Sequence, residues 1–311
     1  MHNRASISQL SDNNYMWFKN LYLYQFEKDF TLDAEALHEE LSGKPFTECS
    51  AMQRESMGWV PPLGKNSQSY THAANGFILL TMARQERLLP ASVVREELDE
   101  RVIEIQDRES RKVGTKEKKE LRERIEDEFL PRAFTRTQKM DAWIDPAGGW
   151  LVINTSSPAR AEAFSTLLRK TIGSLPVVPP KTEAVSPCLT QWLSDYKAPD
   201  PFVIGDECEL KGSGDNTGVA AFKKHELGTD DVKTNLDSGK YVSKLALIWD
   251  NKVSFVVGED MVVKKLKFLD VLDEKMNEQD PQSHEERMDI EFTLMTGELS
   301  QMIPDLVKQF T

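Results

Sequence analysis

The stretch from Pro90 to Phe134 constrains the fold most, because it is long, helical in its pattern and nearly too polar to bury itself. Apolar residues recur there at steps of three and four in two segments. They are Val94, Leu98, Val102 and Ile105 in the first segment and Leu121, Ile125 and Phe129 in the second. This spacing predicts two amphipathic helices with one narrow apolar stripe each. Gly114 and Thr115 predict the end of the first helix and the cap of the second, and Pro131 predicts its end.

The remaining residues of this stretch are mostly charged, so the other faces of both helices are expected in water. Oppositely charged residues stand four apart at Glu97/Arg101, Glu104/Arg108 and Glu120/Arg124. We therefore predict a protruding two-helix arm over residues 90–131. Such an arm gains little stability from its own narrow apolar seam, so we expect it to rest on a folded body at its base. Its tip either contacts a partner or is solvated, in which case the arm is a helical pair within one monomer.

The length of 311 residues exceeds the size at which one core usually keeps growing. The chain is polar and rich in Asn and Ser at its start, and four prolines fall within LPVVPPKTEAVSP. We expect a disordered extension over 1–15, an N-terminal α+β body over 16–178 that carries the arm, and a C-terminal α+β body over 179–311. Strands separated by turn residues predict antiparallel sheets with flanking helices in both bodies.

Local patterns predict several elements of these bodies. Residues 57–64, MGWVPPLG, are expected to form a turn that carries a buried Trp59, because Pro61 and Pro62 lack backbone donors. Residues 76–90 are expected to form a strand and its return. A hairpin is predicted around Asp250-Asn251, and a C-terminal helix over about 283–310 is expected to kink or end near Pro304.

The charge distribution matters more for function than the net charge of −12, which by itself disfavours a polyanionic partner. From Asp270 onward, eleven acidic residues face three basic ones. From Lys211 to Lys267, ten lysines face eight acidic residues, and the lysines come in clusters. One basic face on an acidic protein is therefore one interpretation, and lysines scattered over solvated strands are the other.

No motif in the chain requires catalysis. G-x-S-x-G, H-E-x-x-H, Walker A and G-x-G-x-x-G patterns are absent, and the five histidines and three cysteines lack ligand spacing. Asp141 and Asp145 are an acid pair that could hold magnesium in a nuclease, but they flank a turn and are more simply solvated. We expect no enzyme activity, metal or cofactor. No apolar run is long enough for a membrane span, which favours a cytoplasmic protein.

Eight separated motifs occur in one order along the chain: WFKNL at 17–21, MGWVPP at 57–62, THAANG at 71–76, FLPRAF at 129–134, LLRKTIGSLPVVP at 167–179, SKLAL at 243–247, KKLKF at 264–268 and LMTGEL at 294–299. From Met16 to the C-terminus the chain closely resembles the RdgC family of recombination-associated proteins. The resemblance implies a nucleoid-associated DNA-binding protein that limits RecA filament function. It also implies a ring-shaped homodimer around double-stranded DNA, without sequence preference, and leaves single-stranded DNA open as a further ligand.

The resemblance also assigns roles to individual residues. Phe134 matches an aromatic residue where the arm closes the ring, and Lys223-Lys224-His225 matches a basic loop in which the family more often has glutamine in place of His225. Clustering adds five DNA-binding candidates to the two lysines of that loop: Lys240, Lys244, Lys264, Lys265 and Lys267. Arg132 and Arg136 are second-choice contacts that could equally pair with glutamates of the arm.

A different kind of function stays open beside DNA binding. In this alternative the protein is an interaction factor whose charged arm docks directly on a recombinase, and its contact with DNA is incidental. Lysine-rich loops favour sequence-independent phosphate contacts, because base readout favours bidentate Arg, Asn or Gln on a groove helix. Salt-dependent duplex binding by the isolated protein separates the two functions.

Overall fold

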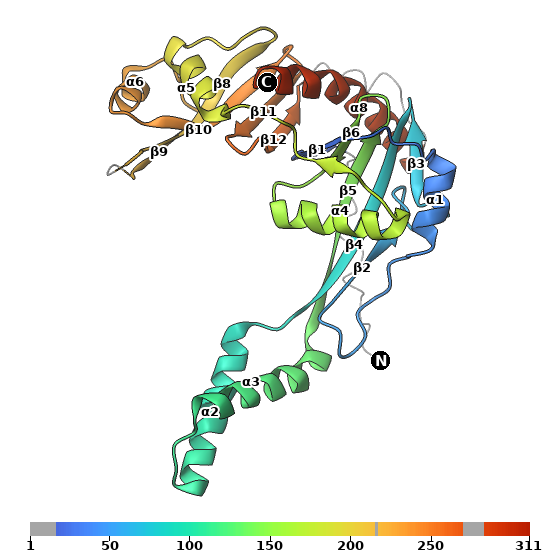
Figure 1. Ribbon diagram of the computed structural model, residues 1–311, viewed down its shortest axis with the longest axis vertical. Coiled ribbons are helices and arrows are strands. Elements are labelled where there is room, and N and C mark those ends of the chain that lie inside the picture. The colour runs from blue at the N-terminus through green and yellow to red at the C-terminus, as the bar shows by residue number, and fades with distance from the viewer. Residues whose placement is uncertain (1–16, 215–216, 270–282) are drawn as a thin grey trace, which may run out of the picture.

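The computed structural model describes residues 17–214, 217–269 and 283–311 (Figure 1). The expected extension over residues 1–15 lies outside these residues. The described chain forms two antiparallel sheets with flanking helices, which confirms the predicted α+β class. None of the described helices has the length and apolar character needed to cross a membrane.

The first sheet follows the order β2-β4-β5-β6-β1-β7, and β3 also pairs with β4. Its strands are β1 (Tyr22–Phe26), β2 (Glu55–Val60), β3 (Thr71–Ala74), β4 (Phe77–Leu88), β5 (Phe134–Asp145), β6 (Trp150–Ile153) and β7 (Val177–Val178). Helices α1 (Ala34–Ser42) and α4 (Pro158–Ile172) bury their apolar stripes against it. In that core, the rings of Trp59 and Phe164 meet edge to face at 5.4 Å, and Trp59 Nε1 donates to Thr171 Oγ1 at 2.9 Å.

Two predictions for this sheet are wrong. The MGWV segment is strand β2 rather than a turn, because Pro61 and Pro62 come after its last paired residue, Val60, and therefore end the strand without interrupting it. Trp59 is buried as predicted. Residues 77–88 form one twelve-residue strand with no return, and β4 pairs with β5 from Ile78 opposite Ile144 to Leu88 opposite Phe134.

Helices α2 (Ala91–Glu109) and α3 (Thr115–Phe129) leave from the ends of β4 and β5, and the short 3-10 helix η2 (Leu130–Arg132) returns the chain to β5. Figure 1 shows this helical hairpin extending away from both sheets. The predicted seam is buried at Val94, Val102 and Ile125. The caps differ from the prediction, since Gly114 is the N-cap of α3 and Ser110, with a φ of 48°, ends α2.

Ion pairs hold the hairpin together and to the sheet. Arg101 binds Glu97 at 2.6 Å on its own helix and Glu128 of α3 at 2.8 Å. These bonds raise the pKa of the Arg101 guanidinium, the bond to Glu128 contributing most. At the hairpin base, Arg54 before β2 binds Glu126 at 2.5 Å, which joins α3 to the body of the protein.

The second sheet follows the order β12-β11-β10-β8-β9. Its strands are β8 (Phe202–Lys211), β9 (Val219–Lys223), β10 (Tyr241–Trp249), β11 (Val253–Gly258) and β12 (Val263–Phe268), and its helices are α5 (Val185–Asp195), α6 (Asp230–Asp237) and α8 (His284–Lys308). Asp250 and Asn251 form the β10–β11 turn, as predicted, with φ values of 47° and 54°. Helix α8 continues through Pro304, so of the two expected effects of this proline, a kink or an end of the helix, the end is wrong.

The two sheets share backbone pairing and packing. Leu21 and Val263 exchange backbone hydrogen bonds at 2.9 and 3.1 Å, and the Leu266 N–H donates to Lys19 O at 2.9 Å. One hydrophobic core extends from Trp143 of the first sheet to α8 and the second sheet. The division at residues 178 and 179 into two bodies stays a prediction.

Candidate nucleic-acid interface

The second sheet has one covered face and one open face. Leu245, Leu247 and Trp249 of β10 are buried against the helical side, where the Trp249 Nε1–H donates to Asp305 of α8 at 2.9 Å. Since successive side chains of a strand point to opposite faces, Lys244 and Ile248 lie on the other face. We call this other side of the sheet the open face.

A shallow hollow occupies the middle of the open face. Its floor is apolar, and two lysines of β12 stand at its margin; the residues concerned are Ile204, Ala246, Ile248, Val256, Lys265 and Lys267. Ala246 and Val256 are only 7% and 5% exposed. Because Lys265 and Lys267 border the hollow and Lys244 lies on the same side of the sheet as Ile248, the structure brings these three lysines to one face.

Two of these lysines already have carboxylate partners on β8. Lys244 Nζ lies 2.7 Å from Glu209 Oε2, and Lys265 Nζ lies 2.6 Å from Glu207 Oε2. The hydrogen bond from Lys244 is the main cause that lowers the pKa of the Glu209 carboxyl below its ordinary value. Both pairs reduce the positive charge that the open face presents.

Lys223, Lys224 and Lys267 are exposed. Among the residues that the structure describes, none of the three forms an ion pair. Lys223 ends β9 opposite Glu207 of β8. Lys224 follows with a φ of 51° and forms a bulge, after which the His225 N–H donates to Asp206 O of β8 at 3.0 Å. Glu207 is thus the register partner of Lys223 and the ion-pair partner of Lys265.

The other candidates of the second sheet are held by local contacts. Lys240 Nζ donates to Asn235 Oδ1 at 2.5 Å, and Lys264 Nζ lies 3.7 Å from Asp260. Both lysines are half-buried. His225 lies 3.0 Å from Asp231, so its ring is tied to the start of α6. These residues have less freedom to meet a phosphate than Lys223 and Lys224.

The candidates at the hairpin base lie in a separate part of the molecule (Figure 1). Arg136 Nη2 binds Glu86 of β4 at 2.5 Å, so its partner is a cross-strand glutamate and not one of the hairpin. Arg132 is exposed and, within the described residues, forms no ion pair. Phe134 is 84% exposed, which rules out a role in the core of this subunit.

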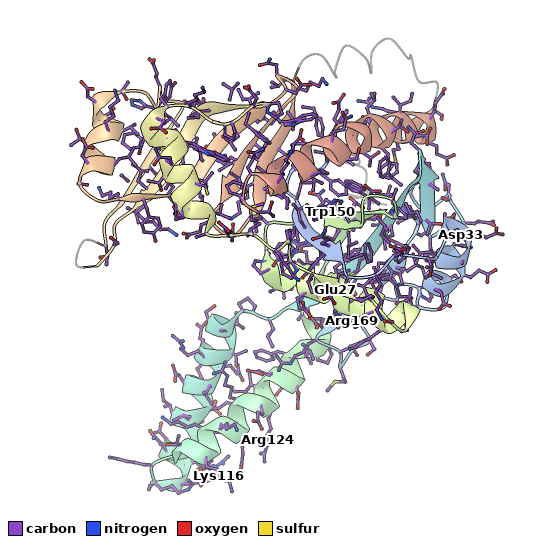
Figure 2. The ribbon with its side chains drawn as sticks, turned by 45° about the horizontal axis from the view of Figure 1, so that its top comes forward. Glu27, Asp33, Lys116, Arg124, Trp150 and Arg169 are labelled. Carbon is purple, nitrogen blue, oxygen red and sulfur yellow. The ribbon has the colours of Figure 1, made fainter. Side chains whose placement is uncertain are left out.

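Sequence patterns did not single out the cations at the end of α4. Arg169 and Lys170 fall in its last turn and are exposed, where they also complement the helix dipole. Figure 2 shows Arg169 on α4 and Lys116 and Arg124 on the hairpin. A basic last turn is a common stabilising device, so its pattern carried no functional signal.

The acid pair considered for magnesium is used structurally. Asp141 Oδ1 accepts from Thr81 Oγ1 at 2.7 Å, and Asp145 Oδ1 accepts from Gly148 N at 2.7 Å within the turn after β5. In the described ranges, no group of three or more His, Cys, Asp or Glu side chains is placed to hold a metal ion. The absence of enzyme activity stays a prediction.

Comparison with known proteins decides the family. The family described as "Putative exonuclease, RdgC" matches residues 16–311. The chain belongs to the RdgC family. Recombination-associated protein RdgC of Tolumonas auensis is 40% identical over 293 residues, which cover 94% of this chain and 97% of that protein. RdgC of Aeromonas hydrophila is 40% identical over 292 residues, covering 94% and 96%, and RdgC of Psychromonas ingrahamii is 38% identical over 296 residues, covering 95% and 98%.

The family name and the names of the relatives differ in what they say of activity. The family description contains the word exonuclease, whereas the three RdgC relatives are named for recombination. The resemblance seen in the eight sequence motifs is confirmed by this match.

Proposed function

We propose that this RdgC protein binds DNA without sequence preference, as a ring-shaped homodimer around the duplex, and that it limits RecA filament function in the nucleoid. The observation that carries the proposal is the pair Lys223-Lys224, exposed and free of ion pairs among the described residues of a chain with a net charge of −12. Lysines with solvated ammonium groups contact phosphates as point charges and read no bases.

The shape of the subunit supports a ring. Figure 1 shows the chain as an open curve, with the second sheet at one end and the α2–α3 hairpin at the other. Two such curves related by a two-fold axis enclose a space when both pairs of ends meet. In this proposal the hairpin is the arm that closes one side, and Phe134, 84% exposed at its base, is the closing contact.

Acidic surface elsewhere on the protein confines DNA to the inside of such a ring. The field of a molecule with a net charge of −12 repels a polyanion from most of the surface. Phosphates then approach only where lysines outnumber carboxylates. Lys223, Lys224 and Lys267 satisfy this condition better than Lys244 and Lys265, which Glu209 and Glu207 neutralise.

The test is a salt series with two unrelated duplexes, measured by fluorescence anisotropy. Each phosphate contact releases counterions, so the logarithm of affinity falls linearly with the logarithm of salt concentration. Lys223→Glu/Lys224→Glu is expected to weaken both duplexes by a similar factor and to flatten the slope by about two units. Lys65→Glu/Lys308→Glu, at two exposed lysines, changes the net charge equally and controls for the general field.

Two results contradict the proposal. An unchanged slope in the folded Lys223/Lys224 variant removes this pair from the DNA contact, and strong preference for one duplex contradicts sequence-independent binding. The alternative function, direct docking of the charged hairpin on a recombinase, predicts that RecA inhibition persists when duplex binding is lost. Measuring RecA inhibition by the same variant separates occlusion of DNA from protein contact.

A further inference from the structure

The charges of the α2–α3 hairpin are separated along its length. Its shaft, residues 91–107 and 120–129, holds eleven acidic residues against four basic ones, whereas its tip, residues 108–119, holds six basic residues against two acidic ones. All six cations of the tip are exposed: Arg108, Arg111, Lys112, Lys116, Lys118 and Lys119. A surface that is charged for solubility alone intersperses the two signs, so solubility does not account for this separation.

One arginine ties the turn at the tip to both helices. Arg111 donates to Glu117 at the start of α3 through two hydrogen bonds of 2.7 Å, and to Glu109 at the end of α2 at 2.8 Å. The bond between Arg111 and Glu117 is the main cause that raises the pKa of the guanidinium and lowers the pKa of the Glu117 carboxyl. Val113, between the helices, is buried. The turn is therefore held in place, and arginine already binds both carboxylates of the tip.

The lysines of the tip supply the remaining positive charge. Lys112, Lys116 and Lys118 form no ion pair within the described chain, and Lys119 lies 3.9 Å from Glu123, a long distance for an ion pair. Lys116 and Lys118 stand at the start of α3, where the helix dipole disfavours positive charge. Their position costs helix stability, so these lysines are better explained by binding than by folding.

The tip is electrostatically separate from the acidic body of the protein. Figure 1 shows it at the opposite end of the molecule from the second sheet, and Figure 2 shows Lys116 at its free end. The 19 residues of α2 span about 28 Å. Because charges are screened over about 8 Å at physiological ionic strength, an anion at the tip responds to the surplus of four positive charges there and little to the body.

A nucleic acid fits this surface better than an acidic protein does. Stable protein interfaces depend on aromatic or aliphatic side chains that become buried at their centre. The large hydrophobic residues that the described chain exposes lie outside the tip, where Val113 is buried. Phosphates need only solvated cations. The acidic shaft repels a duplex that lies along the hairpin, so the contact is confined to the tip.

We propose that the hairpin tip binds the phosphates of a second DNA duplex, so that one protein dimer joins two DNA segments. The first segment is held at Lys223 and Lys224, after β9 at the other end of the subunit (Figure 1). This inference rests on the proposed function, because it takes that contact as the first DNA site. Lysines at the tip contact phosphates as point charges, so the second duplex is also bound without sequence preference.

A bridging assay with the full chain tests the inference. A biotinylated duplex on beads is loaded with protein, and capture of a fluorescent duplex of unrelated sequence is measured over a salt series. We call Lys112→Gln/Lys116→Gln/Lys118→Gln the tip variant. It is expected to reduce capture about tenfold or more and to flatten the salt slope of capture by nearly three units, since each phosphate contact contributes about 0.9. Its affinity for a single short duplex in solution is expected to change little.

Two further variants separate the tip from general charge. Arginine at the same three positions keeps the charge and is expected to retain capture. Three exposed lysines outside the hairpin give the control for lost charge, Lys28→Gln/Lys65→Gln/Lys308→Gln, which is expected to capture as wild type does. Circular dichroism and analytical ultracentrifugation show whether the tip variant is folded and dimeric. Both are expected, because the substitutions remove charge that the start of α3 disfavours.

The outcomes separate this inference from the proposed function. Equal capture by wild type and the folded tip variant, or equal loss in the charge control, overturns the second site and leaves the ring standing. Unchanged capture with weaker RecA inhibition assigns the tip to a protein partner, and a tip variant that no longer dimerises makes the tip a subunit contact; either result overturns the inference. Single-duplex binding whose salt slope is flattened by the tip variant, and not by Lys223→Glu/Lys224→Glu, overturns the proposed function instead.

Discussion

Leu88 and Phe134 lie opposite each other at the end of the β4–β5 ladder, where the hairpin begins, and both are exposed, to 41% and 84%. Val93, at the start of α2, is 42% exposed. Opposite residues of an antiparallel ladder have neighbouring side chains. An aromatic ring so little covered within its own subunit gains most from burial against another molecule.

Replacing Phe134 by serine is expected to weaken self-association and duplex binding together, because an open ring releases DNA. Loss of an aromatic anchor at the centre of an interface costs about 2 kcal/mol or more. The melting temperature is expected to change little, since the side chain is exposed. Ultracentrifugation and anisotropy are the measurements, and Ile103→Ser, 57% exposed further along α2, is the control. Unchanged dimer affinity in Phe134→Ser would exclude this residue from the interface.

The hairpin was predictable because a thin stripe with helical spacing in an otherwise charged stretch leaves few alternatives. Strand β2 is hard to predict because Pro61 and Pro62 stand next to it and favour a turn, although both follow its last residue, Val60. The polar end of β4 favours a turn in the sequence, but it pairs with β5 as far as Leu88 and with β2 as far as Glu86, so strands on both sides hold it extended. Local propensity cannot show where a proline falls relative to the last hydrogen bond.

The candidate site shows a second limit of sequence analysis. Lys244 and Lys265 look as free in the sequence as Lys223, but their partners Glu209 and Glu207 are 35 and 58 positions away. Only the order of the strands brings these charges together. Clustering therefore predicted a lysine-rich face, and it could not predict which lysines are neutralised.

Neutralising the two glutamates of the open face is expected to strengthen DNA binding. Glu207→Gln/Glu209→Gln releases Lys265 and Lys244 from their ion pairs and removes two negative charges next to the proposed path of the phosphates. If both lysines then contact phosphates, the salt slope steepens by about two units. Glu39→Gln/Glu40→Gln on α1, both exposed, controls for net charge. An affinity gain equal to that of the control shows that the open face is not beside the DNA.

Arg87 is expected to fix the direction of the hairpin. Its guanidinium donates to Ala133 O at 3.1 Å and Pro131 O at 3.4 Å at the hairpin base, and also to the carbonyls of Ser50 and Cys49. Arg87→Ala leaves these carbonyl acceptors without their protein donor and is expected to lower the free energy of unfolding by about 1–3 kcal/mol. Amide hydrogen exchange should accelerate in α2 and α3 while the second sheet is unchanged.

Arg84→Ala is the control for this variant, because Arg84 lies on the same strand and binds the half-exposed Glu55 at 2.6 Å. An exposed pair of that kind contributes less than about 1 kcal/mol. Equal exchange rates in the hairpin of wild type and Arg87→Ala would show that the packing of Leu130 and Ile125, not the arginine, orients the two helices.

Asp141 is expected to make stability depend on pH. Burial raises the pKa of its carboxyl above the ordinary 3.8, and the hydrogen bond from Thr81, the register partner of Asp141 on β4, opposes that shift only in part. A raised folded-state pKa favours the protonated form in the folded chain. Protonation of Asp141 therefore stabilises the folded chain fully below pH 3.8, and this stabilisation is lost as the pH rises through the folded-state pKa of Asp141.

Asp141→Asn keeps an oxygen that can accept from Thr81 and carries no charge at any pH. The variant is expected to melt close to wild type at acidic pH and above it at neutral pH, so the difference in melting temperature grows with pH. Asp29→Asn, at an exposed position, is the control. Calorimetry of the three proteins between pH 4 and pH 8 gives the measurement. A difference that shrinks as the pH rises would mean that the Asp141 carboxylate, held by Thr81 and attracted by Lys139, stabilises the folded chain in its charged form.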